Sequence, residues 1–133
     1  MTAIRKLPDN CIESGASYFW LDEDGILVIL NKPTALQTRA DAEENILVTR
    51  KVSAGTPRPL LIDITDIKSM SREAREVYAN EGSEGKVKAV ALITRSAMGR
   101  IVGNFFLNFN KPSVPTRLFN DVETAKKWLL AYI

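Results

Sequence analysis

Two apolar stretches, a nearly continuous one at 59–64 and a largely apolar one at 86–94, most constrain what this chain can fold into. Strands buried on both faces have this composition, and they occur in parallel sheets that are covered by helices. A segment with helical periodicity follows each stretch, and another precedes the first. Because right-handed crossovers join parallel strands, this alternation predicts an α/β fold with a mostly parallel central sheet.

The remaining elements follow from turn and cap signals. Asp24 and Gly25 lie between apolar runs at 17–21 and 26–30, which predicts a hairpin. Capping-box spacing at 38–41 begins a helix that we expect to extend to about residue 52. Helices beginning at Ser71, Ser96 and 120–123, with a short strand at 115–119, complete the order β-β-α-β-α-β-α-β-α. This order gives a sheet of about five strands with flanking helices.

Length and composition indicate one globular domain. The chain has 133 residues, of which 45% are hydrophobic and 26% charged, as in ordinary globular proteins. We expect a loosely structured leader at 1–15, with room for a short strand, and one domain at 16–133. The chain contains neither a secretory signal pattern nor an apolar run of the roughly 18–20 residues that span a bilayer, so we expect a cytoplasmic protein without a membrane span.

Charge is unevenly distributed along the chain. Residues 1–84 carry ten Lys and Arg against fourteen Asp and Glu, whereas 85–133 carry eight against two. The net charge of +2 is too small to indicate nucleic acid as a partner. The basic half either steers an acidic protein or an anionic small ligand, or consists of solvated faces of separate elements.

The residue types needed for most enzyme chemistry are scarce. The chain has no histidine and a single cysteine, Cys11, which excludes triads, an internal disulfide and most transition-metal sites. The acidic cluster at 22–24 is typical of a hairpin turn, with a metal site as the alternative. We therefore predict no catalytic residue, no metal and no cofactor.

A polar junction between the strand at 59–64 and the next helix is the first candidate binding surface. Open α/β sheets bind ligands where strands end and helices begin. Arg72 and Arg75 are candidates for recognising carboxylates or phosphates, with exposed helix ion pairs as the alternative. The helix itself has a narrow apolar stripe of Ala74, Val77 and Tyr78. The other candidates in the junction are Asp63, Thr65, Asp66, Ser69 and Ser71, of which Ser71 is expected to cap the helix. For Asp63 and Asp66 the alternative to binding a cation or ligand is a turn in which the carboxylate bonds nearby backbone amides.

The helix beginning at Ser96 is the second candidate surface, because it has more apolar residues than one core-facing stripe needs. Three interpretations remain open: a helix buried between the sheet and its neighbours, a contact with a twin subunit, or a pocket for an apolar ligand. Gly99 and Gly103 lie one turn apart and suit close packing on the sheet. Farther along, Arg117 falls in an apolar strand, where a buried ion pair would explain it. The apolar residues in question are Met98, Ile101, Val102, Phe105, Phe106, Leu107 and Phe109.

Several segments resemble the SpoIIAA-like STAS family, which includes the anti-sigma factor antagonists, and more closely an uncharacterised bacterial branch of it. The likeness covers roughly 17–131 and lies in the segments 18–27, 71–76, 100–106 and 110–119 and in the ending Trp128-Leu129. The resemblance implies a SpoIIAA-like α/β fold and a regulatory role through protein binding. Similarity of the wider group to lipid-binding CRAL-TRIO domains implies a carrier as the alternative.

The phosphoserine switch of the antagonists does not carry over to this chain. Those proteins have Asp-Leu-Ser-Gly at a strand end and Asp-Ser-Ser-Gly at the start of the next helix. Here Asp63-Ile64-Thr65-Asp66 matches the first motif and Ser71-Arg72-Glu73-Ala74 the second, so Arg72 and Glu73 occupy the serine positions. We therefore predict a noncatalytic interaction module without that switch, either monomeric or a homodimer.

Overall fold

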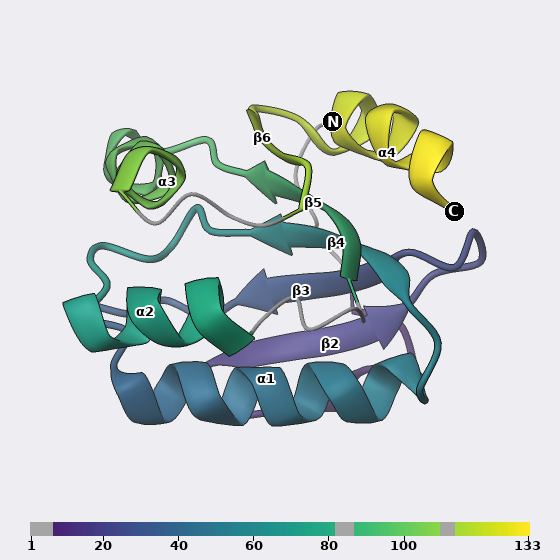
Figure 1. Cartoon of the computed structure of the whole chain (residues 1–133), viewed down its shortest axis with the longest axis horizontal. Helices are drawn as coiled ribbons and strands as arrows, with labels where there is room; N and C mark the ends of the chain where they lie inside the picture. The colour runs from purple at the N-terminus through teal and green to yellow at the C-terminus, as the bar shows by residue number, and fades with distance from the viewer. Residues whose placement is uncertain (1–6, 82–86, 110–113) are drawn as a thin grey trace.

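The computed structural model describes residues 7–81, 87–109 and 114–133, apart from the side chains of Glu81, Phe106 and Phe109. In these ranges a six-stranded sheet is combined with four α-helices (Figure 1). The strands are β1 (Ile12–Glu13), β2 (Ser17–Leu21), β3 (Leu27–Asn31), β4 (Arg58–Asp63), β5 (Val87–Ile93) and β6 (Thr116–Phe119). The helices are α1 (Arg39–Ser53), α2 (Arg72–Glu81), α3 (Ala97–Phe109) and α4 (Val122–Leu129), which the 3₁₀ turn η1 (Leu130–Tyr132) continues.

The sheet is mixed, and its strands lie in sequence order from β1 to β6. The pairs β1–β2 and β2–β3 are antiparallel, and the three pairs from β3 to β6 are parallel. The predicted α/β class is confirmed. The sixth strand is β1, which lies inside the segment 1–15 that we expected to be a loose leader. It pairs with β2 through a short turn, which reverses the chain and makes the pair antiparallel.

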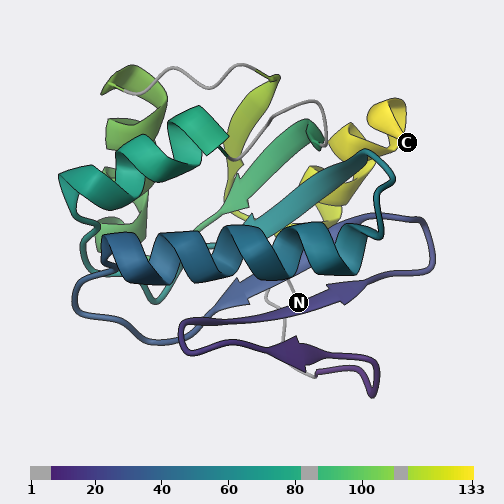
Figure 2. The same ribbon diagram turned by 60° about the horizontal axis from the view of Figure 1, so that its bottom comes forward.

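Three helices cover one face of the sheet and α4 covers the other. Figure 2 shows α1 and α2 in front of the strands and α4 behind them. Right-handed crossovers that advance in one direction place successive helices on the same face. No crossover follows α4, so it folds back over the opposite face and packs on β4 and β5.

Both faces of the sheet carry apolar side chains, which explains the continuous apolar stretch in β4. Leu60 packs in a cluster with Phe19 and Leu27 on the α1 side, and Leu61 packs with Leu129 on the α4 side. Successive residues of a strand point to opposite faces, so both must be apolar when both faces are covered. Burying a side chain such as the fully buried Leu61 contributes about 2 kcal/mol.

The predicted turns and helix starts are confirmed by their hydrogen bonds. In the capping box of α1, Thr38 Oγ1 accepts from the amide of Asp41, whose carboxylate accepts from the Thr38 amide. In the hairpin, Gly25 has a φ of 84°, which favours glycine, and its amide donates to the carbonyl of Asp22. Asp121 caps α4 by accepting from the amide of Thr124, and this bond lowers the pKa of the Asp121 carboxyl.

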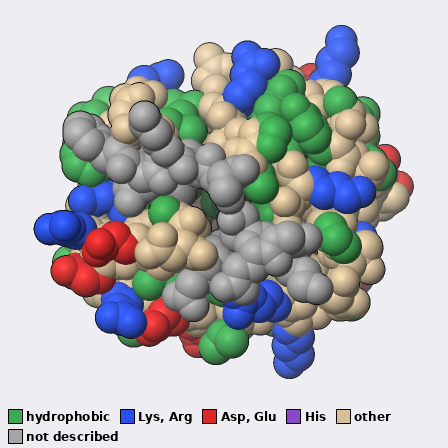
Figure 3. Space-filling view, viewed as in Figure 1, with side chains coloured by type: hydrophobic (Ala, Val, Ile, Leu, Met, Phe, Trp, Pro, Cys, Tyr) green, Lys and Arg blue, Asp and Glu red, His purple; other side chains and the backbone are tan. Residues whose placement is uncertain are grey.

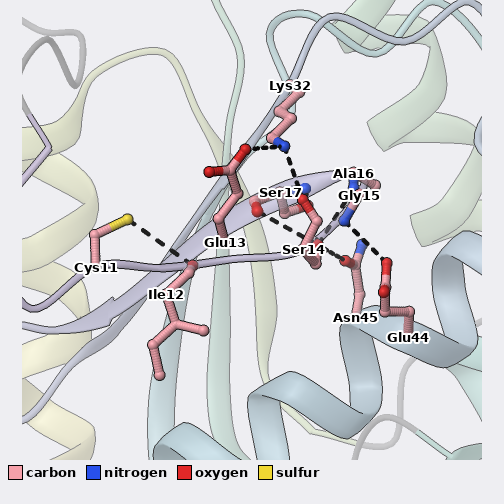
Figure 4. A network of polar contacts seen from close by, with 10 residues as sticks. All are labelled: Cys11, Ile12, Glu13, Ser14, Gly15, Ala16, Ser17, Lys32, Glu44 and Asn45. Carbon is pink, nitrogen blue, oxygen red and sulfur yellow. Dashed lines mark hydrogen bonds and ion pairs between the residues drawn. The ribbon is translucent and has the colours of Figure 1, made fainter.

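Polar contacts attach the β1 edge to the rest of the domain (Figure 4). Lys32 Nζ lies 2.6 Å from Glu13 Oε2 and donates to the carbonyl of Ser14 at 2.7 Å. From α1, Asn45 Oδ1 accepts from Ser14 Oγ at 3.1 Å, and Glu44 Oε1 accepts from the amide of Gly15 at 3.0 Å. Contacts from Lys32, directly after β3, and from α1 therefore hold the short outer strand in place.

Among the described helices, each is too short or too polar to cross a membrane.

Candidate binding surface at the carboxyl ends of the parallel strands

The segments that follow β3 and β4 are bonded to each other beyond the ends of their strands. The amide of Thr34 donates to the carbonyl of Asp66 at 3.1 Å, and the amide of Lys68 donates back to the Thr34 carbonyl at 2.9 Å. Farther on, the amide of Gln37 donates to Ser69 and the amide of Ser71 donates to Gln37, both at 2.9 Å. These bonds extend the parallel ladder and attach the junction between β4 and α2 to the segment after β3.

Asp63 closes the end of β4. Its side chain is buried, and its Oδ1 accepts from the amide of Thr65 at 2.9 Å, as aspartates do in turns. Its backbone carbonyl accepts from Asn31 Nδ2 at 3.0 Å. The carboxylate that the sequence offered as a ligand-binding group therefore shapes the turn.

Thr65 connects this turn to the start of α3. Its Oγ1 accepts from the amide of Arg95 at 3.2 Å, and its carbonyl accepts from Ser96 Oγ at 2.7 Å. Ser96 Oγ in turn accepts from the amide of Gly99 at 2.9 Å, which caps α3. The hydroxyl groups of Thr65 and Ser96 are thus already used in bonds within the fold.

The serines of the junction also have structural partners. Ser71 Oγ accepts from the amide of Ala74 at 3.0 Å, so the predicted N-cap of α2 is confirmed. Ser69 is exposed, and its hydroxyl donates to the carbonyl of Ala35 at 2.6 Å. Asp66 is exposed as well, and its backbone carbonyl is the acceptor for Thr34.

An open cavity of about 430 Å³ lies at this edge of the sheet. Of the residues predicted for the two candidate surfaces, Thr65, Asp66 and Met98 line it. Asp63 and Ser71 do not line it. The remaining lining residues, which sequence reasoning did not select, are Pro33, Thr34, Ala35, Lys68 and Ser96. Their place in the chain could have indicated a role at this site, because Pro33 and its neighbours directly follow a strand that runs parallel to β4.

The two arginines of α2 have different surroundings. The Arg72 side chain is 78% exposed, and its Nε lies 3.9 Å from Glu76 Oε1, an exposed pair worth only tenths of a kcal/mol. Arg75 Nη1 donates to the carbonyl of Met70 at 2.9 Å, and its guanidinium carbon lies 4.3 Å from the centre of the Phe105 ring. Arg75 therefore joins α2 to α3, while Arg72 faces solvent.

The apolar surplus of α3 lies partly on the surface of the molecule. Met98, Ile101 and Phe105 are 48%, 60% and 39% exposed. Val102 is buried in a cluster with Ile64. Leu107 is half-buried, and the Phe106 side chain lies outside the described residues. The interpretation of α3 as a helix covered on all sides is therefore wrong for the three exposed side chains.

Arg117 corrects another expectation. It does not form a buried ion pair; its side chain is exposed. The guanidinium carbon lies 5.2 Å from the centre of the Phe119 ring and 5.8 Å from that of Trp128. Stacking on aromatic rings explains an arginine in this apolar strand.

The acidic cluster at 22–24 forms the hairpin turn. Asp22 Oδ1 accepts from the amides of Asp24 and Ile26, at 2.9 and 3.0 Å. Its Oδ2 lies 3.1 Å from Lys126 Nζ. Within 7–81, 87–109 and 114–133, no three carboxylate or cysteine side chains gather in a group that could hold a metal ion.

A buried chain of hydrogen bonds lies next to the junction, and the sequence did not predict it. The Tyr78 hydroxyl, which we expected on an apolar stripe, donates to Gln37 Oε1 and accepts from Asn45 Nδ2. Gln37 Nε2 donates to Asn31 Oδ1, and Asn31 Nδ2 donates to the carbonyl of Asp63. Burial raises the pKa of Tyr78, and the hydrogen bond from Asn45 lowers it by less.

With the geometry established, the chain can be placed among known proteins. The sequence profile of the family described as "Domain of unknown function (DUF7793)" matches residues 19–133. The chain belongs to this family. No curated protein matches it.

Two solved structures are similar to this DUF7793 domain. An uncharacterised protein of the DUF3478 family from Shewanella loihica PV-4, which has a SpoIIAA-like fold, shares 21% sequence identity with a TM-score of 0.57, over 90% of each chain. A protein of unknown function from Arthrobacter sp. FB24 shares 28% identity with a TM-score of 0.36, over 89% of this chain and 95% of that chain. The first likeness confirms the SpoIIAA-like fold that the sequence segments indicated.

Proposed function

We propose that the chain is a noncatalytic regulatory module that binds a protein partner through the carboxyl ends of its parallel strands and the adjoining side of α3. One observation carries the proposal. Three large apolar side chains, Met98, Ile101 and Phe105, are exposed next to the junction. Exposed apolar side chains that lie together are typical of interaction sites.

The chemistry of the junction supports binding rather than catalysis. The carboxylate of Asp63 and the hydroxyls of Thr65 and Ser71 are bonded to backbone groups of the same fold. A general base needs a matched pKa and free access to the proton that it removes. These groups instead shape the turn after β4, cap α2 and fix the start of α3.

The position of the apolar residues also favours a protein over a carried small molecule. Met98 lines the cavity, but Ile101 and Phe105 lie outside it on the exposed side of the helix. A carrier would bury such residues around an enclosed apolar pocket. An open cavity lined by hydroxyl, charged and apolar groups next to an exposed apolar helix face is suited to a protein surface.

The test compares partners recovered by tagged protein in the organism that encodes it. Ile101→Asp should abolish recovery of a partner that the wild-type protein retains, because a carboxylate would have to be desolvated in the interface. The matched control is Leu47→Asp on α1, where the replaced leucine is 64% exposed. A partner retained by Ile101→Asp, or lost equally by both variants, would contradict the proposed surface.

A further inference from the structure

The exposed apolar residues of α3 form one short strip, which we define as Met98, Ile101 and Phe105. Their spacing of three and four residues places them along one side of the helix. The strip extends about 10 Å along the axis, at 1.5 Å per residue. It begins at the cavity, because Met98 is one of the residues that line it. A helix of about two turns from a partner protein would match this length.

Positively charged residues lie at both ends of the strip. Lys68 lines the cavity together with Met98, and Arg95 lies next to Ser96 at the start of α3. On the neighbouring helix, Arg75 lies over Phe105, and Arg72 is one turn before it. We define these four residues, Lys68, Arg72, Arg75 and Arg95, as the basic rim.

Fewer negative charges lie nearby. Asp66 lines the cavity, Glu76 is 3.9 Å from Arg72, and the exposed Glu73 follows Arg72 in the first turn of α2. Figure 3 shows side chains of both signs over the left end of the molecule, where α2 begins, and Lys or Arg at several points of its outline. The four cations of the rim exceed these three carboxylates by one charge. Such an excess attracts a partner of opposite charge and disfavours a basic one.

From this geometry we infer that the strip and the basic rim bind an acidic amphipathic helix of the partner protein. The inference rests on the proposed function and adds the chemistry of the partner. Apolar residues one turn apart on that helix would cover Met98, Ile101 and Phe105. Its carboxylates would lie beside Lys68 and Arg72, where arginine can bind a carboxylate with two parallel hydrogen bonds.

The same charges disfavour a second copy of this chain as the occupant. In a twofold dimer the same surface meets itself, so each residue of the basic rim would approach the rim of the other subunit. Like charges brought together in this way oppose association. A partner that supplies carboxylates removes this repulsion.

The experiment selects binding peptides from a displayed library of random helical sequences, with the 133-residue chain as bait. We expect enriched peptides to combine Asp and Glu with large apolar residues one turn apart. Synthetic peptides of these sequences should bind at least about tenfold more weakly to Ile101→Asp and to Lys68→Glu/Arg72→Glu, and more weakly as salt screens the charges. The controls Leu47→Asp and Lys127→Glu, both at exposed positions, should bind as the wild type does.

One set of results would contradict only the acidic character of the partner, and another would contradict the proposed function as well. Peptides that depend on Ile101 but show no acidic bias, and bind equally to Lys68→Glu/Arg72→Glu, would overturn the acidic partner and leave the docking surface standing. A selection in which no peptide depends on Ile101 would reject both. A dimer seen by sedimentation and lost in Ile101→Asp would assign the strip to a second copy. Binding of a single-stranded oligonucleotide that needs the basic rim but not Ile101 would also overturn the inference.

Discussion

Tyr78 is the residue at which the buried polar contacts of this domain meet. Its hydroxyl bonds to Gln37 and to Asn45, which belong to the segment after β3 and to α1. Gln37 continues the chain to Asn31 at the end of β3. The Tyr78 hydroxyl therefore links α2 directly to α1 and to the segment after β3, and through Gln37 to the end of β3. Each of these bonds replaces one that water would make, so removing a partner leaves a buried group unsatisfied.

Tyr78→Phe should lower the free energy of unfolding by about 1–3 kcal/mol, because Gln37 and Asn45 would lose their partner in a buried place. Urea denaturation monitored by circular dichroism measures the change. The matched control is Tyr18→Phe, since the Tyr18 hydroxyl has no hydrogen bond within the described ranges and only its ring contacts Lys32. Equal loss in the two variants would contradict the role assigned to the buried hydroxyl.

The contribution of Tyr78 to the free energy of unfolding should also depend on pH. Burial raises the pKa of Tyr78 in the folded protein above its usual value of about 10. A raised folded-state pKa means that the stabilisation is complete below the unfolded-state pKa and is lost as pH increases beyond it. Above about pH 10 the wild-type protein should therefore lose stability more steeply than Tyr78→Phe. Parallel curves in urea titrations at increasing pH would disprove this.

Spacing along the chain could not reveal these contacts. Tyr78 falls on the inner stripe of α2 with Ala74 and Val77, and a tyrosine there is ordinarily read as apolar. Its partners lie more than thirty positions earlier. The bonds of Asp63 and Ser71, by contrast, are with amides two and three residues away, so their turn and cap roles were visible in the sequence.

At the scale of elements, α3 depends on two glycines that face the sheet. A Cβ at Gly99 would lie 3.0 Å from the carbonyl oxygen of Ile64 and even closer to the hydroxyl of Thr94. A Cβ at Gly103 would lie 3.1 Å from Leu118 Cδ1 and 3.2 Å from Ile64 Cδ1, which are ends of flexible side chains. At Gly99 the helix thus lies against backbone just beyond the end of β4, whereas at Gly103 it lies against side chains that can shift.

Gly99→Ala should lower the free energy of unfolding by about 1–3 kcal/mol, since backbone must move to admit the methyl group. Gly103→Ala is the matched comparison. There, the better helix propensity of alanine, worth about 1 kcal/mol, offsets the small shift of Leu118 and Ile64. Thermal unfolding of both variants tests this difference. A larger loss of stability in Gly103→Ala than in Gly99→Ala would show that a methyl group is less well accommodated at Gly103, contrary to this prediction.

The elements themselves were largely predictable because their signals are local. The hairpin turn, the caps at Thr38 and Ser71 and the strand at 59–64 each depend on residues close together in the chain. The side of α3 left exposed was not predictable from one helix. It depends on what covers each side, as where Arg75 of α2 lies over Phe105.

At the scale of the whole molecule, the alternation of elements predicted the α/β class, but the full strand pairing needed the structure. β1 is two residues long, and pairing with β2 rather than its own composition makes it a strand. The cavity combines segments after β3, β4 and β5, which only the parallel register brings together. A sequence locates the edge where ligands bind in such sheets, but not which side chains meet there.

One contact joins the two ends of the chain across the domain. Lys126 of α4 lies 3.1 Å from Asp22 Oδ2 in the β2–β3 hairpin. No other hydrogen-bond donor in the described part of the chain reaches that buried oxygen. The Asp22 side chain is 9% exposed and that of Lys126 37%, so the pair is screened from water on the aspartate side only.

Lys126→Met should therefore destabilise the protein, because it keeps most of the apolar stem but leaves a buried carboxylate oxygen unpaired. We expect a loss of about 1–2 kcal/mol, below the 3–5 kcal/mol typical of a fully buried pair, since Lys126 remains partly in water. Lys127→Met, at the exposed next position, is the matched control and should change stability by less than about 0.5 kcal/mol. Urea denaturation at low and high salt measures both variants. If Lys126→Met were as stable as Lys127→Met, the hairpin and α4 would be held together by apolar packing alone.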